Sequence, residues 1–326
     1  MKSEILRLLK ESDDYISGQQ MCDRFHVSRT AVWKAIEQLK KEGYEIEAVR
    51  NRGYRLLESP DIMSETEIRS LMDTEWAGKN IVYFDEIDST NNRAKELGEK
   101  DGVHGTLFVA DRQVAGKGRR GRVWESPKGI SIYMTILLRP DLIPTKAPML
   151  TLVMAQSVAQ GIRVVTGMET GIKWPNDIVM NKKKVCGILT EMSTEIDYIN
   201  YVVIGVGINV NQKVFDEELK EKATSLMIET GAPVKRSALI AAVMKHFEKN
   251  YALFMENGDL SGLQESYNEM LVNRGKEVRI LEPGNEYNAH AYGINETGEL
   301  IVRTQKGEEK HIFAGEVSVR GIYGYV

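Results

Sequence analysis

The chain has 326 residues and a formal net charge of −4, which permits two or three domains but argues against nucleic-acid binding along its whole length. Its two cysteines, Cys22 and Cys186, lie far apart without C-x-x-C spacing, so neither a disulfide framework nor a thiolate metal site is indicated. The sequence has no apolar signal core at its start and no apolar run near the roughly 20 residues that span a bilayer, so we expect a cytoplasmic protein with no membrane partner.

The first 60 residues read as three short helices and a hairpin. Ser17 and Gln20 have the spacing of a capping box that opens the second helix, and Ser28 is expected to cap the third. Apolar residues of the third helix recur at i, i+3, i+4 and i+7, which predicts one buried stripe of Val32, Ala35, Ile36 and Leu39. Residues 44–57 alternate like a hairpin. This pattern is typical of a winged helix-turn-helix domain, which we place at residues 1–62.

Basic side chains are concentrated in this first domain. Between residues 24 and 57 there are eight Lys or Arg and four Glu, which favours DNA binding. Side chains near the start of a recognition helix read base edges in the major groove, and cations of the wing contact the backbone or the minor groove. We therefore expect DNA contacts from Gly18, Gln19, Ser28, Arg29, Thr30, Trp33, Lys34, Arg50 and Arg52. Two alternatives stay open, since Trp33 also fits a core position and winged helices also bind proteins.

The rest of the chain has a different pattern of expected strands and helices. Residues 57–67 are expected to form a linker. From residue 66 to 270, strands alternate with helical stretches, and several strands follow each other without a helix between them, which predicts a mixed α+β domain that is not doubly wound. Residues 271–326 form short alternating segments separated by Gly, Asn and Pro turns, as in a small SH3-like β-barrel.

The glycine-rich segment GKGRRGR, residues 116–122, matches the G-x-G-x-x-G pattern of a dinucleotide-binding turn. That pattern requires a helix directly after it, whereas this segment is followed by Pro127, Gly129 and a β-branched and aromatic run. A Walker loop is excluded because no G-x-x-x-x-G-K-[ST] occurs. We expect a mobile cationic loop whose backbone amides approach phosphates closely and whose arginines bind them bidentately.

Two further segments belong with this loop. DSTN, residues 88–91, places hydroxyl and amide groups at a helix start, and residues 171–189 carry candidate lysines. Each motif alone is weak, because a helix-start Ser is ordinarily a cap and a Gly/Arg loop is often a solvated turn. In this order, and after a winged helix, DSTN, GKGRRGR, KWPND, KVCGILTE, GVGINVN and GEVSVR resemble the biotin protein ligases, in particular those that are also biotin operon repressors.

The resemblance implies a fold and a reaction. The central domain would be a mixed α/β ligase domain of the biotin/lipoate type, which uses ATP and Mg²⁺ to convert biotin to biotinoyl-5′-AMP. It would then pass the biotinyl group to a lysine of a biotin carboxyl carrier protein. The adenylate-bound homodimer would bind operator DNA. Because an anionic carboxylate attacks an anionic phosphate in the first step, cations have to converge on the site.

The resemblance also implies the roles of individual residues. Biotin and its adenylate would contact Ser89, Thr90, Asn91, Gln113, Lys117, Gly118, Arg119, Arg120, Arg122, Trp124, Lys184, Asn209 and Asn211. Among these, the first four would hold the ureido head and the last two the adenine side. Catalysis would depend on Arg119, Lys184, Lys173 and Asp177. Asp177 has a second interpretation as a turn carboxylate, and the Mg²⁺ ligands stay unassigned.

Two positions depart from the family pattern. Lys117 stands where an arginine is common, which replaces a guanidinium fork by a point charge. Cys186 stands where a small apolar residue is common, and we expect its thiol to be buried and inert.

Two other functions remain open at this stage. One is a biotin-sensing transcription factor without catalysis, against which the dense cationic loop and Lys184 argue. The other is a related acyl-adenylating ligase, such as one for lipoate, which the winged helix and the GEVSVR tail disfavour.

Overall fold

The computed structural model describes residues 1–282, 285–313, 318–321 and 325. The chain divides into two compact units, and each is described by itself. The first consists of Met1–Asp73 with Lys235–Ala241, and the second of Thr74–Val234 with Ala242–Val326. These units do not coincide with the three ranges expected from the sequence, 1–62, 66–270 and 271–326, which stay a prediction of domain organisation.

The first unit contains helices packed with a two-stranded antiparallel hairpin. Its elements are α1 (Lys2–Glu11), α2 (Gly18–Phe25), α3 (Arg29–Lys41), β1 (Glu45–Val49), β2 (Gly53–Glu58) and α4 (Glu65–Leu71). The predicted capping box is confirmed, because the Ser17 hydroxyl accepts from the Gln20 amide and the Gln20 side chain accepts from the Ser17 amide. The predicted apolar stripe of α3 is buried along its whole length.

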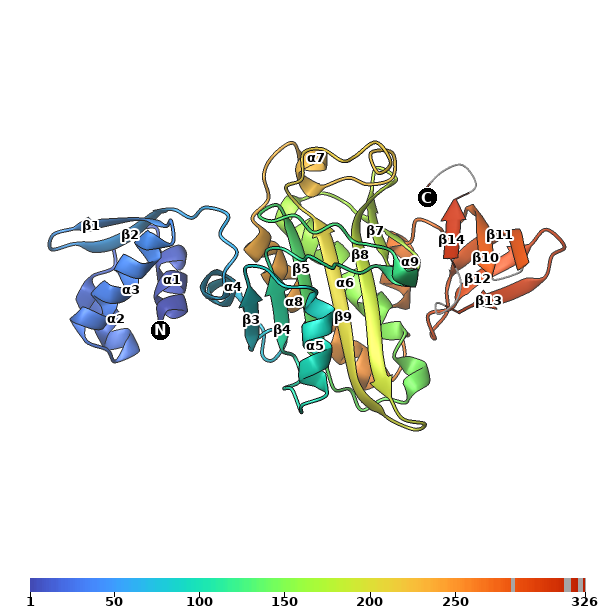
Figure 1. Ribbon diagram of the computed structural model, residues 1–326, viewed down its shortest axis with the longest axis horizontal. Helices are drawn as coiled ribbons and strands as arrows, with labels where there is room; N and C mark the ends of the chain where they lie inside the picture. Colours follow the sequence, from blue (N-terminus) through green and yellow to red (C-terminus); the bar gives the residue numbers. More distant parts are fainter. Residues whose placement is uncertain (283–284, 314–317, 322–324, 326) are drawn as a thin grey trace. The chain divides into compact units, whose positions relative to one another are not determined.

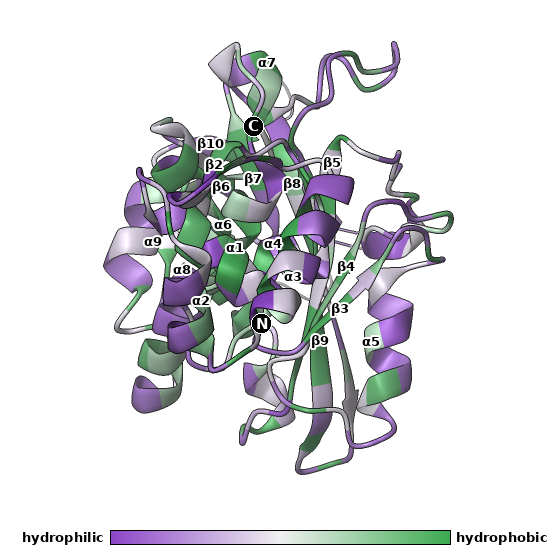
Figure 2. Cartoon of the chain, turned by 90° about the vertical axis from the view of Figure 1, so that its left-hand side faces the viewer, coloured by the Kyte–Doolittle hydropathy of each residue, from purple (hydrophilic) through white to green (hydrophobic). Residues whose placement is uncertain are grey.

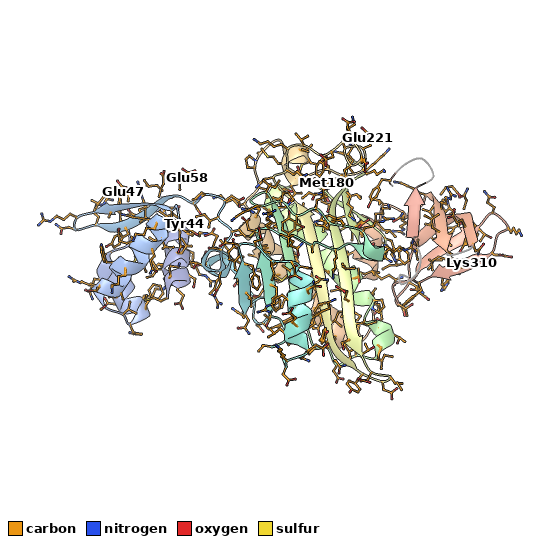
Figure 3. The ribbon with its side chains drawn as sticks, in the orientation of Figure 1. Tyr44, Glu47, Glu58, Met180, Glu221 and Lys310 are labelled. Atoms are coloured by element: carbon orange, nitrogen blue, oxygen red, sulfur yellow. The ribbon has the colours of Figure 1, made fainter. Side chains whose placement is uncertain are left out.

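Helix α4 corrects the linker that we expected at residues 57–67. Ser64 caps the helix by accepting from the Glu67 amide, and the Arg7 guanidinium of α1 donates to the carbonyls of Ser70 (3.0 Å) and Met72 (2.6 Å) at its other end. The buried Glu67 carboxylate accepts from the Tyr44 hydroxyl and from Lys10; Tyr44 is labelled in Figure 3. Residues 65–71 therefore form a helix held by long-range bonds, whereas residues 59–63 have no regular secondary structure.

The second unit is built on a seven-stranded mixed sheet with strand order β3-β4-β5-β9-β8-β7-β6. Its strands are β3 (Ile81–Phe84), β4 (Leu107–Ala110), β5 (Ser131–Leu138), β6 (Gly171–Lys173), β7 (Asp177–Met180), β8 (Lys183–Thr194) and β9 (Ile199–Asn209). Only β3 and β4 pair in parallel, which confirms a mixed sheet that is not doubly wound. The segment GIKWPNDIVM forms β6 and β7, joined by a turn that contains the cis Trp174–Pro175 peptide.

Helices cover both faces of this sheet (Figures 1 and 2). The helices are α5 (Thr90–Gly98), α6 (Met149–Thr166), α7 (Leu226–Thr230), α8 (Arg236–Asn257) and α9 (Gln264–Met270). Helix α5 packs on β5 and β9 at one face, whereas α6 and α8 lie at the other. The stretch Pro144–Thr166, which contains α6, is long and apolar enough to cross a membrane by length and composition, but 72% of its most apolar window is buried inside the protein, as in a core helix.

The C-terminal part of the second unit is a five-stranded antiparallel sheet with strand order β13-β12-β11-β10-β14. Its strands are β10 (Glu277–Glu282), β11 (Asn285–Ile294), β12 (Leu300–Thr304), β13 (Glu309–Ile312) and β14 (Ser318–Gly321). The predicted strand-rich character is confirmed, whereas closure into an SH3-like barrel stays a prediction. The GEVSVR motif lies partly outside the described residues.

Candidate active site

The glycine-rich loop does not open a helix. Its centre is a single 3-10 turn, Arg119–Gly121, in which Arg120 has a positive φ of 58°, and a β-bridge joins Lys117 to Val123. The next element is strand β5. This geometry agrees with the exclusion of a dinucleotide-binding turn.

The loop closes over a cleft on the sheet face that carries α5. The cleft has about 460 Å³ of empty space, part of which is open to solvent. Of the residues that we expected to bind biotin or its adenylate, those that line it are Ser89, Thr90, Asn91, Gln113, Lys117, Gly118, Arg119, Trp124 and Lys184. They come from three segments far apart in the sequence, which the fold brings together.

One end of the cleft is polar and lies at the start of α5. Ser89 is the N-cap residue, but its hydroxyl makes no capping bond, although the side chain is only 2% exposed. Gln113 accepts from the Thr90 amide (2.9 Å) and donates to the Ser126 hydroxyl (3.1 Å). Ser89 is therefore not an ordinary cap, and Gln113 has a fixed orientation.

The other end of the cleft is cationic. Arg119 donates to the side-chain oxygen Oδ1 of Asn176 (2.8 Å), and Lys184 Nζ lies 2.6 Å from the Asp177 carboxylate. Burial lowers the pKa of the Arg119 guanidinium, and the neighbouring Arg120 and Arg122 act in the same direction, against the opposing charge of Asp177. A partly desolvated guanidinium interacts strongly with an incoming anion because little water screens it. Sequence reasoning missed Asn176, although it stands in the same KWPND motif.

Glycines of the sheet form the floor of the cleft. A Cβ atom at Gly207 would lie 2.6 Å from the Trp124 indole, and one at Gly187 would lie 2.9 Å from Lys184 and 3.0 Å from Trp124. Only glycine leaves room for these side chains against the strands. The Trp124 Nε1 atom is buried without a hydrogen-bond partner.

The remaining predicted residues lie away from this cleft. Arg120 lines a second cleft, Arg122 is exposed, and Asn209 donates to the Thr224 carbonyl (3.1 Å). The Asn211 amide accepts from the Val234 N–H (2.8 Å) and donates to the Val234 carbonyl (3.0 Å), so it ties the segment after α7 to the end of β9. Contacts of these four residues with the adenylate stay a prediction.

Lys173 and Asp177 meet a residue that no motif indicated. The Tyr325 hydroxyl donates to Asp177, and Lys173 Nζ lies 3.4 Å from the centre of the Tyr325 ring. Lys173 is 5% exposed, and Asp177 is held by Lys184 on its other carboxylate oxygen. The two lysines of this region are thereby linked through one carboxylate and one aromatic ring.

The residues expected to contact DNA are accessible on the first unit. Gly18 is half-buried, and exposed side chains are presented by Gln19, Ser28, Arg29, Thr30, Trp33, Lys34, Arg50 and Arg52. Trp33 is 54% exposed, which excludes the core position that stayed open. Arg29 donates to the side-chain oxygen Oε1 of Gln19 (2.8 Å), so α2 and α3 share one polar surface. Acidic residues, including Glu47 and Glu58 labelled in Figure 3, also lie on the wing.

Cys186 is buried, as predicted. Burial raises the pKa of its thiol strongly, so the reactive thiolate is absent at neutral pH. We expect no alkylation of Cys186 by iodoacetamide at pH 8 in the native protein and full alkylation after denaturation, measured by peptide mass spectrometry. Rapid native labelling of this peptide would contradict the burial.

Comparison with known proteins agrees with this geometry. Residues 83–209 match the biotin/lipoate A/B protein ligase family, residues 2–55 match an HTH domain, and residues 275–320 match the biotin protein ligase C-terminal domain. The bifunctional ligase/repressor BirA of Bacillus spizizenii is 43% identical over 324 residues, which cover 98% of each chain. BirA of Escherichia coli is 28% identical and covers 96% of this chain and 95% of its own.

A solved structure shares the fold of about three quarters of the chain. The biotin protein ligase from Aquifex aeolicus, in complex with biotin and ATP, has a TM-score of 0.66 and 33% identity, and covers 74% of this chain and 99% of its own. Fold, cleft and family matches together define a ligase that also carries a helix-turn-helix domain. The chain belongs to the family of bifunctional biotin ligase/repressors.

Proposed function

We propose that this ligase and repressor activates biotin in the 460 Å³ cleft and then transfers it to a carrier protein. In the first step a biotin carboxylate oxygen forms a bond to the α-phosphorus of ATP, and the bond from that phosphorus to the bridging oxygen breaks to release pyrophosphate. In the second step a lysine amine of the carrier attacks the acyl carbon, AMP leaves, and the amine loses a proton.

The convergence of Arg119 and Lys184 on one cleft carries this proposal. One cation comes from the mobile loop and the other from β8, opposite the polar residues at the start of α5. This arrangement suits a ligand with a neutral polar head at one end and an anion at the other. Charge that builds on the phosphate during attack is stabilised by donors that are already in place.

Mg²⁺ would enter with ATP as part of the substrate. Among the described residues, no three His, Cys, Asp or Glu side chains gather around a position suited to a metal ion. Asp177 is the carboxylate nearest the cationic end, and it already pairs with Lys184 and Tyr325. Mg²⁺ usually keeps several of its waters and binds through substrate phosphates with one or two carboxylates. The small number of carboxylates at the cationic end of the cleft agrees with this mode of binding.

A second cleft supports an entry route for the acceptor lysine of a biotin carboxyl carrier protein. It has a volume of about 900 Å³, shares Arg119, Asn176 and Leu189 with the first cleft, and reaches Met192 on β8. In the described part of the chain, strand β7 pairs with β8 only as far as Gly187, so the β8 edge beyond it has no strand partner on that side.

The same β8 edge supports a homodimer of the adenylate-bound form. An unpaired edge readily accepts a strand of another chain. Exposed apolar side chains at the end of the β8–β9 hairpin, Met192, Ile196 and Tyr198, extend this surface. We propose that the carrier and the second copy compete for it, in the cytoplasm, and that only the dimer represses transcription at an operator.

Operator binding through α3 yields a specific prediction. The Arg29→Ala/Lys34→Ala variant should bind operator DNA about ten- to a hundredfold more weakly. A lost contact to a base edge costs about 1–3 kcal/mol, and a lost contact to a phosphate lowers the salt dependence of binding. Gel-shift titrations at two salt concentrations measure both effects. Carrier biotinylation should stay unchanged, and Lys41→Ala, at the last turn of α3, is the matched control. Unchanged operator affinity would contradict the DNA-reading role of α3.

The experiment that tests the proposed enzyme function is incubation with ATP, Mg²⁺, biotin and an apo carrier domain. Mass spectrometry of the carrier should show the gain of one biotinyl group on one lysine. No gain would favour a biotin sensor without catalysis, and a gain only when lipoate replaces biotin would favour a lipoate-type ligase.

A further inference from the structure

A connected group of hydrogen bonds lies behind the polar end of the cleft. The Asn91 Nδ2 atom donates to Glu191 (2.8 Å) and to the Leu189 carbonyl (3.3 Å), and Asn91 Oδ1 accepts from the Thr135 hydroxyl (2.6 Å). The Thr135 and Thr90 hydroxyl oxygens are 2.8 Å apart. Glu191 also accepts from Lys95 (2.7 Å). Thr135 lies outside the motifs of the sequence, and Glu191, the last residue of KVCGILTE, had no role assigned to it.

The carboxylate of Glu191 fixes the orientation of the Asn91 amide. An ionised carboxylate only accepts hydrogen bonds, so the NH₂ group of Asn91 has to face it. Both hydrogens of that group are then used within the protein, on Glu191 and Leu189. The Asn91 oxygen consequently faces Thr135 and has one lone pair left.

Packing keeps the amide in this place. A Cβ atom at position 205 would lie 2.1 Å from Asn91 Oδ1, so the amide rests directly against the backbone of Gly205 in β9. Asn91 is also only 4% exposed. The Asn91 amide therefore changes its hydrogen bonds mainly by rotating about its Cβ–Cγ bond, which exchanges the oxygen and the nitrogen. It does not move away from Gly205.

The orientation of Asn91 sets the direction of the remaining bonds. The single hydrogen of Thr135 is used on Asn91, so the hydrogen between Thr135 and Thr90 comes from Thr90. The other acceptor within reach of the Thr90 hydroxyl is Gln113 Oε1 at 3.1 Å, which again directs the hydrogen toward protein. Toward the cleft, Thr90 and Asn91 therefore both present lone pairs and act as acceptors.

We propose that Glu191 is a positioning residue for ligand specificity, which makes Thr90 and Asn91 acceptors for the two N–H groups of a cyclic urea. This inference rests on the proposed function, in which the ureido head of biotin occupies the polar end of the cleft. A ureido ring carries two N–H donors and one carbonyl acceptor, whereas the dithiolane ring of lipoate carries no N–H donor. Glu191 thus selects the ring without touching it.

The charges around Glu191 keep its carboxyl group ionised, so that it only accepts hydrogen bonds. Burial opposes ionisation, but the bonds from Lys95 and Asn91 and the charges of Lys95 and Lys117 outweigh it, so the pKa of the Glu191 carboxyl is lowered. Lys95 has a consequence for substitution. In Glu191→Gln, the single side-chain oxygen is attracted to the Lys95 ammonium, which turns the new NH₂ group toward Asn91 and favours the flipped amide.

The test compares variants in which Lys95 does or does not fix the orientation of the side chain at position 191. Glu191→Gln should weaken biotin binding about ten- to a hundredfold, the effect of about one or two mismatched buried hydrogen bonds, and raise the biotin KM alike. The ATP KM and kcat should change little. Lys95→Met keeps the carboxylate and should bind biotin nearly as the wild type does. In the Lys95→Met/Glu191→Gln variant the glutamine oxygen is free to face Asn91, so most of the lost affinity should return.

Calorimetric titration with biotin, together with KM measurements in carrier biotinylation, separates the outcomes. A merely structural ion pair predicts equal damage from Glu191→Gln and Lys95→Met and no recovery in the double variant, which would overturn the inference. Wild-type affinity of Glu191→Gln would overturn it as well. Wild-type protein that neither binds biotin nor labels the carrier would instead contradict the proposed function.

Discussion

Arg119→Gly is expected to release biotinoyl-5′-AMP about ten- to a hundredfold faster than the wild type. The side chain lines the cleft, is held in place by Asn176 at 2.8 Å, and carries a partly desolvated positive charge. Loss of one charge-assisted hydrogen-bonding group costs about 1.5–3 kcal/mol. Retention of radiolabelled adenylate on the protein during gel filtration measures the effect, and free adenylate should accumulate in solution.

Arg122→Gly is the matched control for this prediction. It removes an arginine from the same loop and adds the same glycine, but the Arg122 side chain is exposed and does not line the cleft. Because a contact of Arg122 with the adenylate stays a prediction, retention should fall less than in Arg119→Gly. Equal loss in both variants would mean that general loop flexibility, and not the Arg119 charge, holds the adenylate.

Lys184→Gln is expected to slow adenylate formation about a hundred- to a thousandfold, the usual effect of removing one preorganised group that stabilises transition-state charge. Lys184 comes from β8, lines the cleft and is oriented by Asp177 at 2.6 Å. Because this charge acts mainly on the phosphate as pyrophosphate leaves, biotin affinity should change little. Biotin-dependent pyrophosphate release and biotin titration measure the two quantities.

Lys182→Gln controls for the loss of a nearby positive charge. Lys182 belongs to the same NKKK run but lies exposed in the turn between β7 and β8 and does not line the cleft. Pyrophosphate release by this variant should match the wild type. A comparable loss in Lys182→Gln would show that the net charge of the run, and not the position of Lys184, supports the reaction.

Local patterns predicted those parts of the fold whose bonds are local. The capping box of Ser17 and Gln20 and the buried stripe of α3 depend on neighbours three or four residues away, and both are confirmed. The first turn of helix α4, residues 65–67, was wrongly expected to be linker, because the residues that hold this helix, Arg7 and Tyr44, lie far away in the sequence. The turn that splits GIKWPNDIVM into β6 and β7 was not predicted, although Pro175 and Asn176 are common turn residues.

The candidate site also contains residues that the sequence indicated and residues that depend on distant contacts. Motifs that bind the ligand directly, such as DSTN and the glycine-rich loop, could be read from the sequence because their residue types have an evident chemistry. Thr135 and Glu191 could not, since their role arises only where β5, β8 and α5 meet. Thr135 left one weak signal, the one aliphatic hydroxyl within the run IYMTILL of a fully buried strand.

The central claim is that one cleft forms an enzyme-bound adenylate and then consumes it. The most direct measurement is a single-turnover experiment in which protein is mixed with biotin and α-labelled ATP without carrier, and apo carrier is added afterwards. We expect about one biotin-dependent adenylate to be retained per chain and to disappear on addition of carrier, as AMP and biotinylated carrier appear together. Carrier biotinylation without a retained adenylate, or an adenylate that the carrier does not consume, would contradict the account.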